Sequence, residues 1–158
     1  MYHQLLVPLD GSELSERALP HARDLAQAFK ANLHLLRVIS HIEEFNLIRA
    51  SGDSFMVQEY AQETAERMLQ SRRERAEAYL SQTADHLRSL GLEVRTALQE
   101  GAASENIEQY VAAHSIDLIV MSTHGQGGLR RFFTGSVTDR VLRSVGVPVL
   151  AVPPPAES

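Results

Sequence analysis

Short apolar runs alternate along this chain with longer stretches in which apolar positions recur every three or four residues. The runs cover residues 5–7, 33–39, 92–98, 117–121 and 148–152, and each is typical of a buried strand. Helical spacing covers the stretches between them, residues 14–29, 56–90, 104–114 and 137–145. Strands joined through helices require crossover connections, and these favour a parallel sheet covered on both faces. We therefore predict an α/β fold, a single-domain, doubly wound five-stranded parallel sheet of order 3-2-1-4-5 and Rossmann-like class.

Several residues mark where these elements should begin or end. Ser12 is a suitable N-cap for the first helix, and Pro20 should bend that helix or occupy one of its early turns. Gly91 provides a stop for the long helix. Residues 41–55 are polar and mixed, and we expect them to be a mobile segment able to close over a neighbouring site. One domain is predicted over residues 1–153, followed by a polar tail at 154–158.

Composition excludes several classes of protein. The chain has 158 residues, of which 44% are hydrophobic and 22% charged, as in ordinary globular domains. It has no cysteine, which excludes a disulfide framework, a thiolate metal site and a catalytic thiol. A net charge of −5 argues against a nucleic-acid partner, and the histidines show no metal-ligand spacing. With no run long enough for a membrane span or signal peptide, we expect a cytoplasmic protein.

The most informative stretch is the glycine-rich segment at residues 122–136. It follows the apolar run at 117–121 and precedes a helical pattern formed by Val137, Val141 and Val145. A flexible loop between a strand end and a helix start can direct main-chain N–H groups at an anion, and the helix dipole favours negative charge there. The pattern predicts a phosphate-binding loop.

Two common nucleotide-binding motifs are absent from the sequence. A Walker loop requires Gly-Lys-Ser/Thr, whereas the single lysine, Lys30, lies at the end of the first helical pattern. The dinucleotide fingerprint requires three glycines after the first strand, and Gly11 stands alone there. In the predicted order the first and fourth strands are neighbours, so their ends, at Asp10 and Met121, would flank the crevice where such sheets bind ligands.

Segments along nearly the whole chain resemble the universal stress protein family, in its nucleotide-binding branch. The match is carried by residues 7–12, 117–121, 123–125, 135–137 and 147–152, and by the nine residues separating Gly125 from Gly135. The family motif begins with a glycine three positions before Gly125, where this chain has Ser122. The resemblance implies an adenine nucleotide alpha hydrolase-like fold.

The same resemblance implies a ligand and its contacts. The ligand would be ATP, ADP or AMP, with Mg²⁺ held through the phosphates. Asp10 would accept a hydrogen bond from a ribose hydroxyl, Val38 would pack on adenine, and Ser136 would contact the outer phosphates. The full set of implied site residues is Pro8, Leu9, Asp10, Val38, Met121, Ser122, Thr123, His124, Gly125, Gly135, Ser136 and Val137. A homodimer through the edge strand at 148–152 is also implied. The residues themselves favour no nucleic-acid or membrane partner and no catalytic residue.

Simpler roles compete with these assignments. An Asp before Gly at a strand end often forms only an Asx turn, which is the alternative for Asp10. Ser136 begins a Ser-x-x-Asp pattern that predicts helix capping whether or not phosphate binds. Val38 and Met121 suit the core in either case, and His124 suits a solvated loop.

Three functions remain open from the sequence. The first is an ATP-binding stress-response or signalling protein with slow or absent hydrolysis. The second is a dimeric regulator or scaffold of the same fold that binds no nucleotide, which Ser122 favours. The third is an enzyme of adenylyl or phosphoryl transfer that uses the same crevice.

Overall fold

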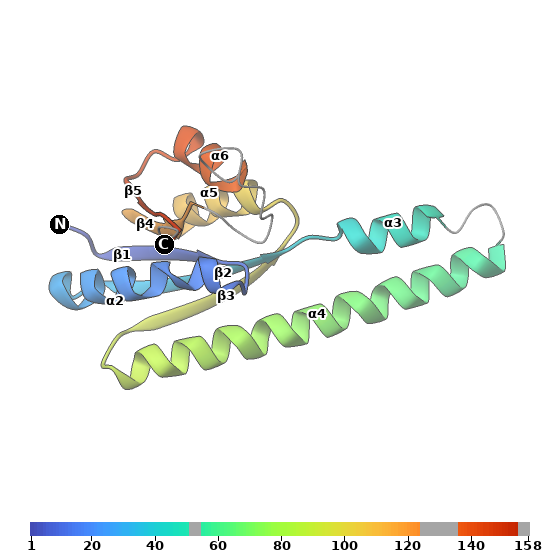
Figure 1. The fold of residues 1–158 in the computed structure, drawn as a ribbon, viewed down its shortest axis with the longest axis horizontal. Coiled ribbons are helices and arrows are strands. Elements are labelled where there is room, and N and C mark those ends of the chain that lie inside the picture. Colours follow the sequence, from blue (N-terminus) through green and yellow to red (C-terminus); the bar gives the residue numbers. More distant parts are fainter. Residues whose placement is uncertain (51–54, 124–135, 155–158) are drawn as a thin grey trace.

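Strands and helices alternate in the computed structural model, which describes residues 1–50, 55–123 and 136–154 (Figure 1). The strands are β1 (Gln4–Leu9), β2 (Asn32–Ile39), β3 (Val94–Glu100), β4 (Leu118–Ser122) and β5 (Val149–Val152). The helices are α1 (Glu13–Glu16), α2 (Ala18–Phe29), α3 (Ile42–Ala50), α4 (Phe55–Ser89), α5 (Ala103–Ala113) and α6 (Ser136–Ser144). The alternation predicted from the apolar pattern is confirmed.

All five strands are parallel and lie in the order β3-β2-β1-β4-β5, as the sequence predicts. Leu5 in the central strand pairs with Leu33 on one side and with Leu118 on the other. Because all strands run the same way, every strand's carboxyl end lies at one edge of the sheet.

The two faces of the sheet bury separate apolar clusters. On one face, Leu5 and Val7 pack with α2 and with the C-terminal half of α4. On the other face, Leu6 and Ile119 pack with α5 and α6, and Figure 1 shows these two helix pairs on opposite sides. Alternate residues of a strand point to opposite faces, so β1 contributes to both clusters. Each fully buried Leu or Val stabilises the fold by roughly 1.5–3 kcal/mol.

The first helical pattern is interrupted at Arg17, which separates α1 from α2. Pro20 lies in the first turn of α2, where the missing N–H does least harm, as expected. Ser12 caps α1 by accepting a hydrogen bond from the Ser15 N–H at 3.1 Å.

Gly91 ends α4 as predicted. Its φ of +84° is left-handed, and its N–H donates to the carbonyl of Arg88 at 2.9 Å. The next residue, Leu92, still donates to the Leu87 carbonyl, so β3 begins at Val94 and runs to Glu100, two residues later than predicted.

No helix is predicted within residues 41–55, but the structure has one there. These residues include the whole of α3, which packs on α4 and runs beside its N-terminal part (Figure 1). Helix α4 has 35 residues and is roughly 50 Å long, so its N-terminal half extends well past the sheet.

Candidate functional site

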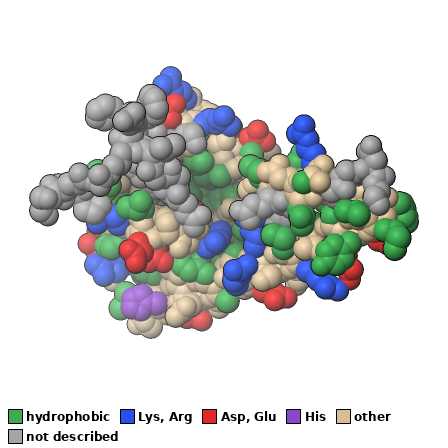
Figure 2. All heavy atoms as spheres, turned by 45° about the vertical axis from the view of Figure 1, so that its right-hand side comes forward, with side chains coloured by type: hydrophobic (Ala, Val, Ile, Leu, Met, Phe, Trp, Pro, Cys, Tyr) green, Lys and Arg blue, Asp and Glu red, His purple; other side chains and the backbone are tan. Residues whose placement is uncertain are grey.

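The carboxyl ends of β1, β2 and β4 bring most of the described candidate residues to one edge of the sheet. Figure 2 turns that edge toward the viewer and shows a hollow with apolar side chains at its bottom. His124, Gly125 and Gly135 lie outside the described residues, and Ser136 is described only as the first residue of α6.

Asp10 organises the turn that follows β1. Its Oδ1 accepts hydrogen bonds from the Ser12 N–H at 2.9 Å and from the Ser12 hydroxyl at 2.6 Å. The Asp10 N–H in turn donates to Ser15 Oγ at 3.3 Å. This is an Asx turn, as one of the two predicted roles of Asp10 requires, and the same bonds hold its carboxylate at the sheet edge.

Gly11 takes a φ of +81°, and its Cα lies against the guanidinium of Arg37. A Cβ at Gly11 would come within 2.2 Å of Arg37 Nη1. The same guanidinium stands 5.2 Å from the Tyr79 ring centroid, a cation–π distance. Arg37 therefore places a positive charge beside the turn. Sequence reasoning missed it, although an arginine near the end of an otherwise apolar strand was a usable signal.

Three predicted residues share the α5–α6 face of the sheet. Met121 is buried there, and Val38 packs against the same cluster. Continuing the β1–β4 register from Leu6 and Ile119 places the half-buried Pro8 level with Met121. These side chains form an apolar surface just inside the carboxyl edge.

Leu9 behaves differently from its neighbour Pro8. It is 3% exposed and packs in the cluster on the opposite face, with α2 and α4. Only its main chain can border a ligand on the α5–α6 face, because alternate strand residues point to opposite sides.

The start of α6 is joined to the end of β4. The Thr138 hydroxyl, in the first turn of α6, donates to the Ser122 carbonyl at 3.0 Å. Val137 beside it is 36% exposed. A helix N-terminus carries unpaired N–H groups and a partial positive charge, so this contact brings an anion-favouring feature to the strand end.

Thr123 is less available than predicted. Its N–H donates to the Val152 carbonyl at 3.0 Å, which continues the β4–β5 ladder. That main-chain donor cannot also bind a phosphate. Thr123 can border a ligand, but any main-chain phosphate contacts must come from other residues.

Glu100 forms a charged cluster at the end of β3. Its Oε1 accepts a hydrogen bond from Arg73 Nε of α4, and its Oε2 lies 2.7 Å from His41 Nε2. The hydrogen bond from Arg73 lowers the pKa of the Glu100 carboxyl below its ordinary value. This cluster joins the base of α3 and the middle of α4 to the sheet.

A second polar cluster lies toward the amino end of the sheet, on β2. The His34 ring is 1% exposed, with Nε2 at 2.8 Å from Gln4 Oε1 and Nδ1 at 3.0 Å from the Tyr110 hydroxyl. A carbonyl oxygen only accepts, so Nε2–H donates to Gln4 and Nδ1 accepts from Tyr110. Burial, helped by Arg95 and His114, lowers the pKa of His34 to about 4. His34 is therefore neutral near pH 7.

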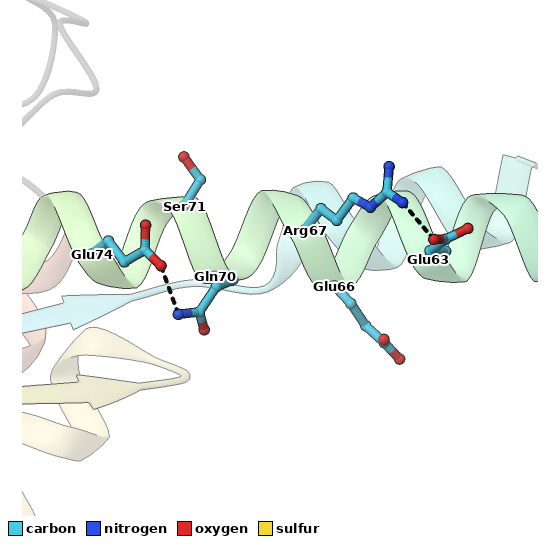
Figure 3. Close-up of a pocket in the computed structure, with 6 residues that line it drawn as sticks. All are labelled: Glu63, Glu66, Arg67, Gln70, Ser71 and Glu74. Atoms are coloured by element: carbon cyan, nitrogen blue, oxygen red, sulfur yellow. Dashed lines mark hydrogen bonds and ion pairs between the residues drawn. The ribbon is translucent and has the colours of Figure 1, made fainter.

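A shallow concavity of about 480 Å³ lies on α4, away from this edge. Figure 3 shows that its lining side chains project from one face of a single helix, with no facing wall. Such a surface does not enclose a small ligand. Within the described ranges, no three His, Asp or Glu side chains could together hold a metal ion. The described helices include none that is long and apolar enough to cross a membrane.

Comparison with known proteins identifies a family that this chain matches. A model of the universal stress protein family matches residues 1–153. Universal stress protein MJ0531 of Methanocaldococcus jannaschii is 30% identical over 155 residues, which cover 98% of this chain and 84% of the relative. The solved structure of MJ0577 from that organism has a TM-score of 0.78 at 28% identity and covers 99% of both chains. A universal stress protein solved in complex with cAMP has a TM-score of 0.66 at 20% identity and covers 96% of each chain.

Proposed function

This chain belongs to the universal stress protein family, and on that premise we propose that it binds an adenine nucleotide at the carboxyl edge of β1 and β4. The observation that carries the proposal is the start of α6 held against the end of β4 by Thr138 and Ser122. It lies at the edge that also holds the Asp10 turn and the apolar surface of Val38 and Met121. An anion-favouring helix start, a carboxylate and an apolar surface match the phosphates, the ribose and the base of a nucleotide.

We assign each part of the nucleotide to a part of the edge. Adenine packs on Val38, the ribose meets Asp10, and the α-phosphate lies near Met121 and Ser122. The glycine-rich segment and the start of α6 hold the outer phosphates through main-chain N–H groups, and Mg²⁺ is held mainly by those phosphates. The complex of a family member with cAMP supports this class of ligand.

The biological role that follows is nucleotide-dependent signalling or stress response, with slow or absent hydrolysis. None of the side chains described at this edge is arranged as a nucleophile with its base, so binding rather than turnover is the proposed activity. The cytoplasmic location inferred from the sequence stays a prediction.

Calorimetric titration with ATP, ADP and AMP tests the proposal. Wild-type protein should bind, and Gly125→Val and Gly135→Val should each weaken ATP binding by about 100-fold or more, since a Cβ in a main-chain cradle blocks close approach. Gly146→Val is the matched control, because a Cβ there meets nothing within 4 Å and should leave affinity unchanged. Unchanged affinity in both loop variants would refute the site.

We also propose a homodimer through β5, the edge strand next to β4. Leu150 on this strand is 39% exposed, and an uncovered apolar edge tends to pair with another strand. Two-fold pairing of β5 with itself would cover both edges. Ala151→Pro should shift the protein to half its mass in sedimentation equilibrium if the strand pairs through its main chain.

A regulator of the same fold that binds no nucleotide is the second candidate. Two observations favour it: Ser122 stands where the family motif has glycine, and the Thr123 N–H is engaged by Val152. Mass spectrometry of an acid extract of the purified protein separates the two functions. An adenine nucleotide in the extract supports the first function, and an empty extract together with no calorimetric binding supports the second.

A further inference from the structure

The two halves of α4 have different surroundings. The C-terminal half buries Ala76, Leu80 and Leu87 against the sheet. The N-terminal half extends beyond the sheet beside α3 and leaves Met56 79% and Tyr60 71% exposed (Figure 1). We call α3 together with residues 55–75 of α4 the arm. Large exposed apolar side chains on a projecting element are typical of a protein–protein contact.

The outward face of the arm carries six side chains along one side of α4. Met56, Tyr60, Glu63, Arg67, Gln70 and Glu74 follow one another at alternating spacings of four and three residues. This spacing keeps the six side chains on one face of the helix, which is apolar at Met56 and Tyr60 and polar or charged from Glu63 to Glu74. Figure 3 shows the last four of them on the face of α4 turned away from α3, where they line the shallow concavity.

This face is complementary to itself when two copies run antiparallel. With the two-fold axis at Ala65, Glu63 of each copy faces Arg67 of the other. The same alignment lays Tyr60 over Gln70, so that the exposed ring of one copy enters the concavity of the other. A contact that uses the same patch on both copies is what a two-fold dimer requires. We propose that the arm is a docking surface for the arm of a second copy, paired antiparallel along α4.

Charge along α4 favours the same direction of pairing. Residues 55–66 contain Glu59, Glu63 and Glu66 and neither lysine nor arginine. Residues 67–75 contain one glutamate and four arginines, of which Arg73 is paired with Glu100 of β3. Antiparallel pairing lays the acidic stretch of each copy over the basic stretch of the other, and parallel pairing would place like charges together. The acidic tip also disfavours an anionic membrane as the occupant.

The Glu63–Arg67 pair gives the arrangement a defined centre. Within one copy Arg67 Nη2 lies 2.5 Å from Glu63 Oε1, with both side chains more than half exposed. Such an isolated surface ion pair contributes little to the stability of the fold. Two of these pairs facing each other form an alternating network of four charges, in which each carboxylate meets a guanidinium from both copies.

Charge reversal tests the proposal in sedimentation equilibrium at matched protein concentration. Glu63→Arg places like charges opposite one another twice and should lower the mass to that of the assembly held by β5 alone, while the double variant Glu63→Arg/Arg67→Glu should restore it. Circular dichroism checks that each variant keeps its helices. The wild-type mass in Glu63→Arg, or no recovery in the double variant, overturns the proposal.

Cross-linking tests the register without disturbing these charges. The chain has no cysteine, so each introduced thiol is the only one present. A mixture of Tyr60→Cys and Gln70→Cys chains should oxidise to the mixed disulfide in preference to either homodimer. Tyr60→Cys mixed with Gln82→Cys, which lies beyond the arm on the same helix, should not cross-link. Homodimers of Tyr60→Cys, or no difference between the two mixtures, would contradict antiparallel pairing.

Discussion

The two ends of the parallel sheet are built from different interactions. Toward the amino end, buried and charged hydrogen bonds join distant segments: Asp117 accepts from the N–H groups of His3 and Gln4, and His34 joins Gln4 to Tyr110. At the carboxyl ends of β1 and β4 the features proposed to meet the nucleotide are more local, a left-handed glycine turn at Gly11 and the start of α6 held to Ser122.

This difference separates stability from binding. A contact between residues that are far apart in sequence holds the tertiary fold, because unfolding breaks it. A local turn or a helix start contributes less to stability and presents polar main-chain groups at the surface. We therefore expect changes at the amino end to alter unfolding, and changes at the carboxyl end to alter nucleotide binding.

The largest expected effect concerns pH and His34. Its pKa of about 4 lies below the ordinary value of 6.5, so between these values the unfolded chain binds a proton that the folded chain does not. The free energy of unfolding should fall by about 3 kcal/mol as pH drops through this window. Urea denaturation at a series of pH values should show this fall in the free energy of unfolding for the wild type. His34→Gln should not show it. An equal slope in both proteins would exclude His34 as its source.

Asp117→Ala should cause the next largest loss of unfolding free energy. The variant leaves the His3 and Gln4 N–H groups without their carboxylate, at a cost of about 1–2 kcal/mol for a partly exposed charged acceptor. Chemical denaturation measures the loss, and Asp117→Asn, which keeps one acceptor oxygen, should lose less. ATP affinity should be unchanged in both variants. A fall in affinity would show that the two ends are coupled.

Asp10→Ala should change nucleotide binding and not mainly the free energy of unfolding. Losing the carboxylate should weaken nucleotide binding by about 10-fold, the value of one well-formed hydrogen bond to a charged group. Ser12→Ala is the matched control, since it removes the hydroxyl bond to Asp10 and the cap of α1, and keeps the carboxylate and the main-chain Ser12 N–H bond to it. Calorimetry should find the larger loss of affinity in Asp10→Ala. Equal losses would mean that the turn, and not the charge, is required.

Gly11→Ala should have the smallest effect, about 1 kcal/mol of unfolding free energy. The left-handed φ of +81° strains any residue with a Cβ, and the Arg37 guanidinium must also move. Adding Arg37→Ala removes the collision and leaves the φ strain, so the double variant should recover only part of the loss seen in denaturation. Full recovery would show that the backbone there carries no strain.

The sheet order could be predicted because strand and helix periods differ and because parallel crossovers leave few topologies. The bounds of β3 were wrong by two residues, since the Leu92 N–H is still bonded to the last turn of α4, at the Leu87 carbonyl. Helix α3 was missed, and in the structure its large apolar residues Ile42, Phe45 and Ile48 are exposed, so the helix has no buried apolar stripe.

The candidate site was only partly predictable. Strand ends bring Asp10, Val38 and Met121 to one edge, which follows from topology alone. Leu9 points to the other face because strand side chains alternate. Two details depend on register: the Thr123 N–H is used by β5, and Arg37 lies against Gly11. Register comes from pairing between distant strands, and a single sequence does not specify it.

Amide chemical shifts recorded during titration with ATP examine both ends of the sheet in one experiment. The proposed site predicts the largest changes at Asp10, Val38, Ser122 and Val137, and little change at His3, Gln4, His34 and His114. Changes concentrated at the amino end, or none anywhere at saturating ATP, would contradict nucleotide binding at the carboxyl edge.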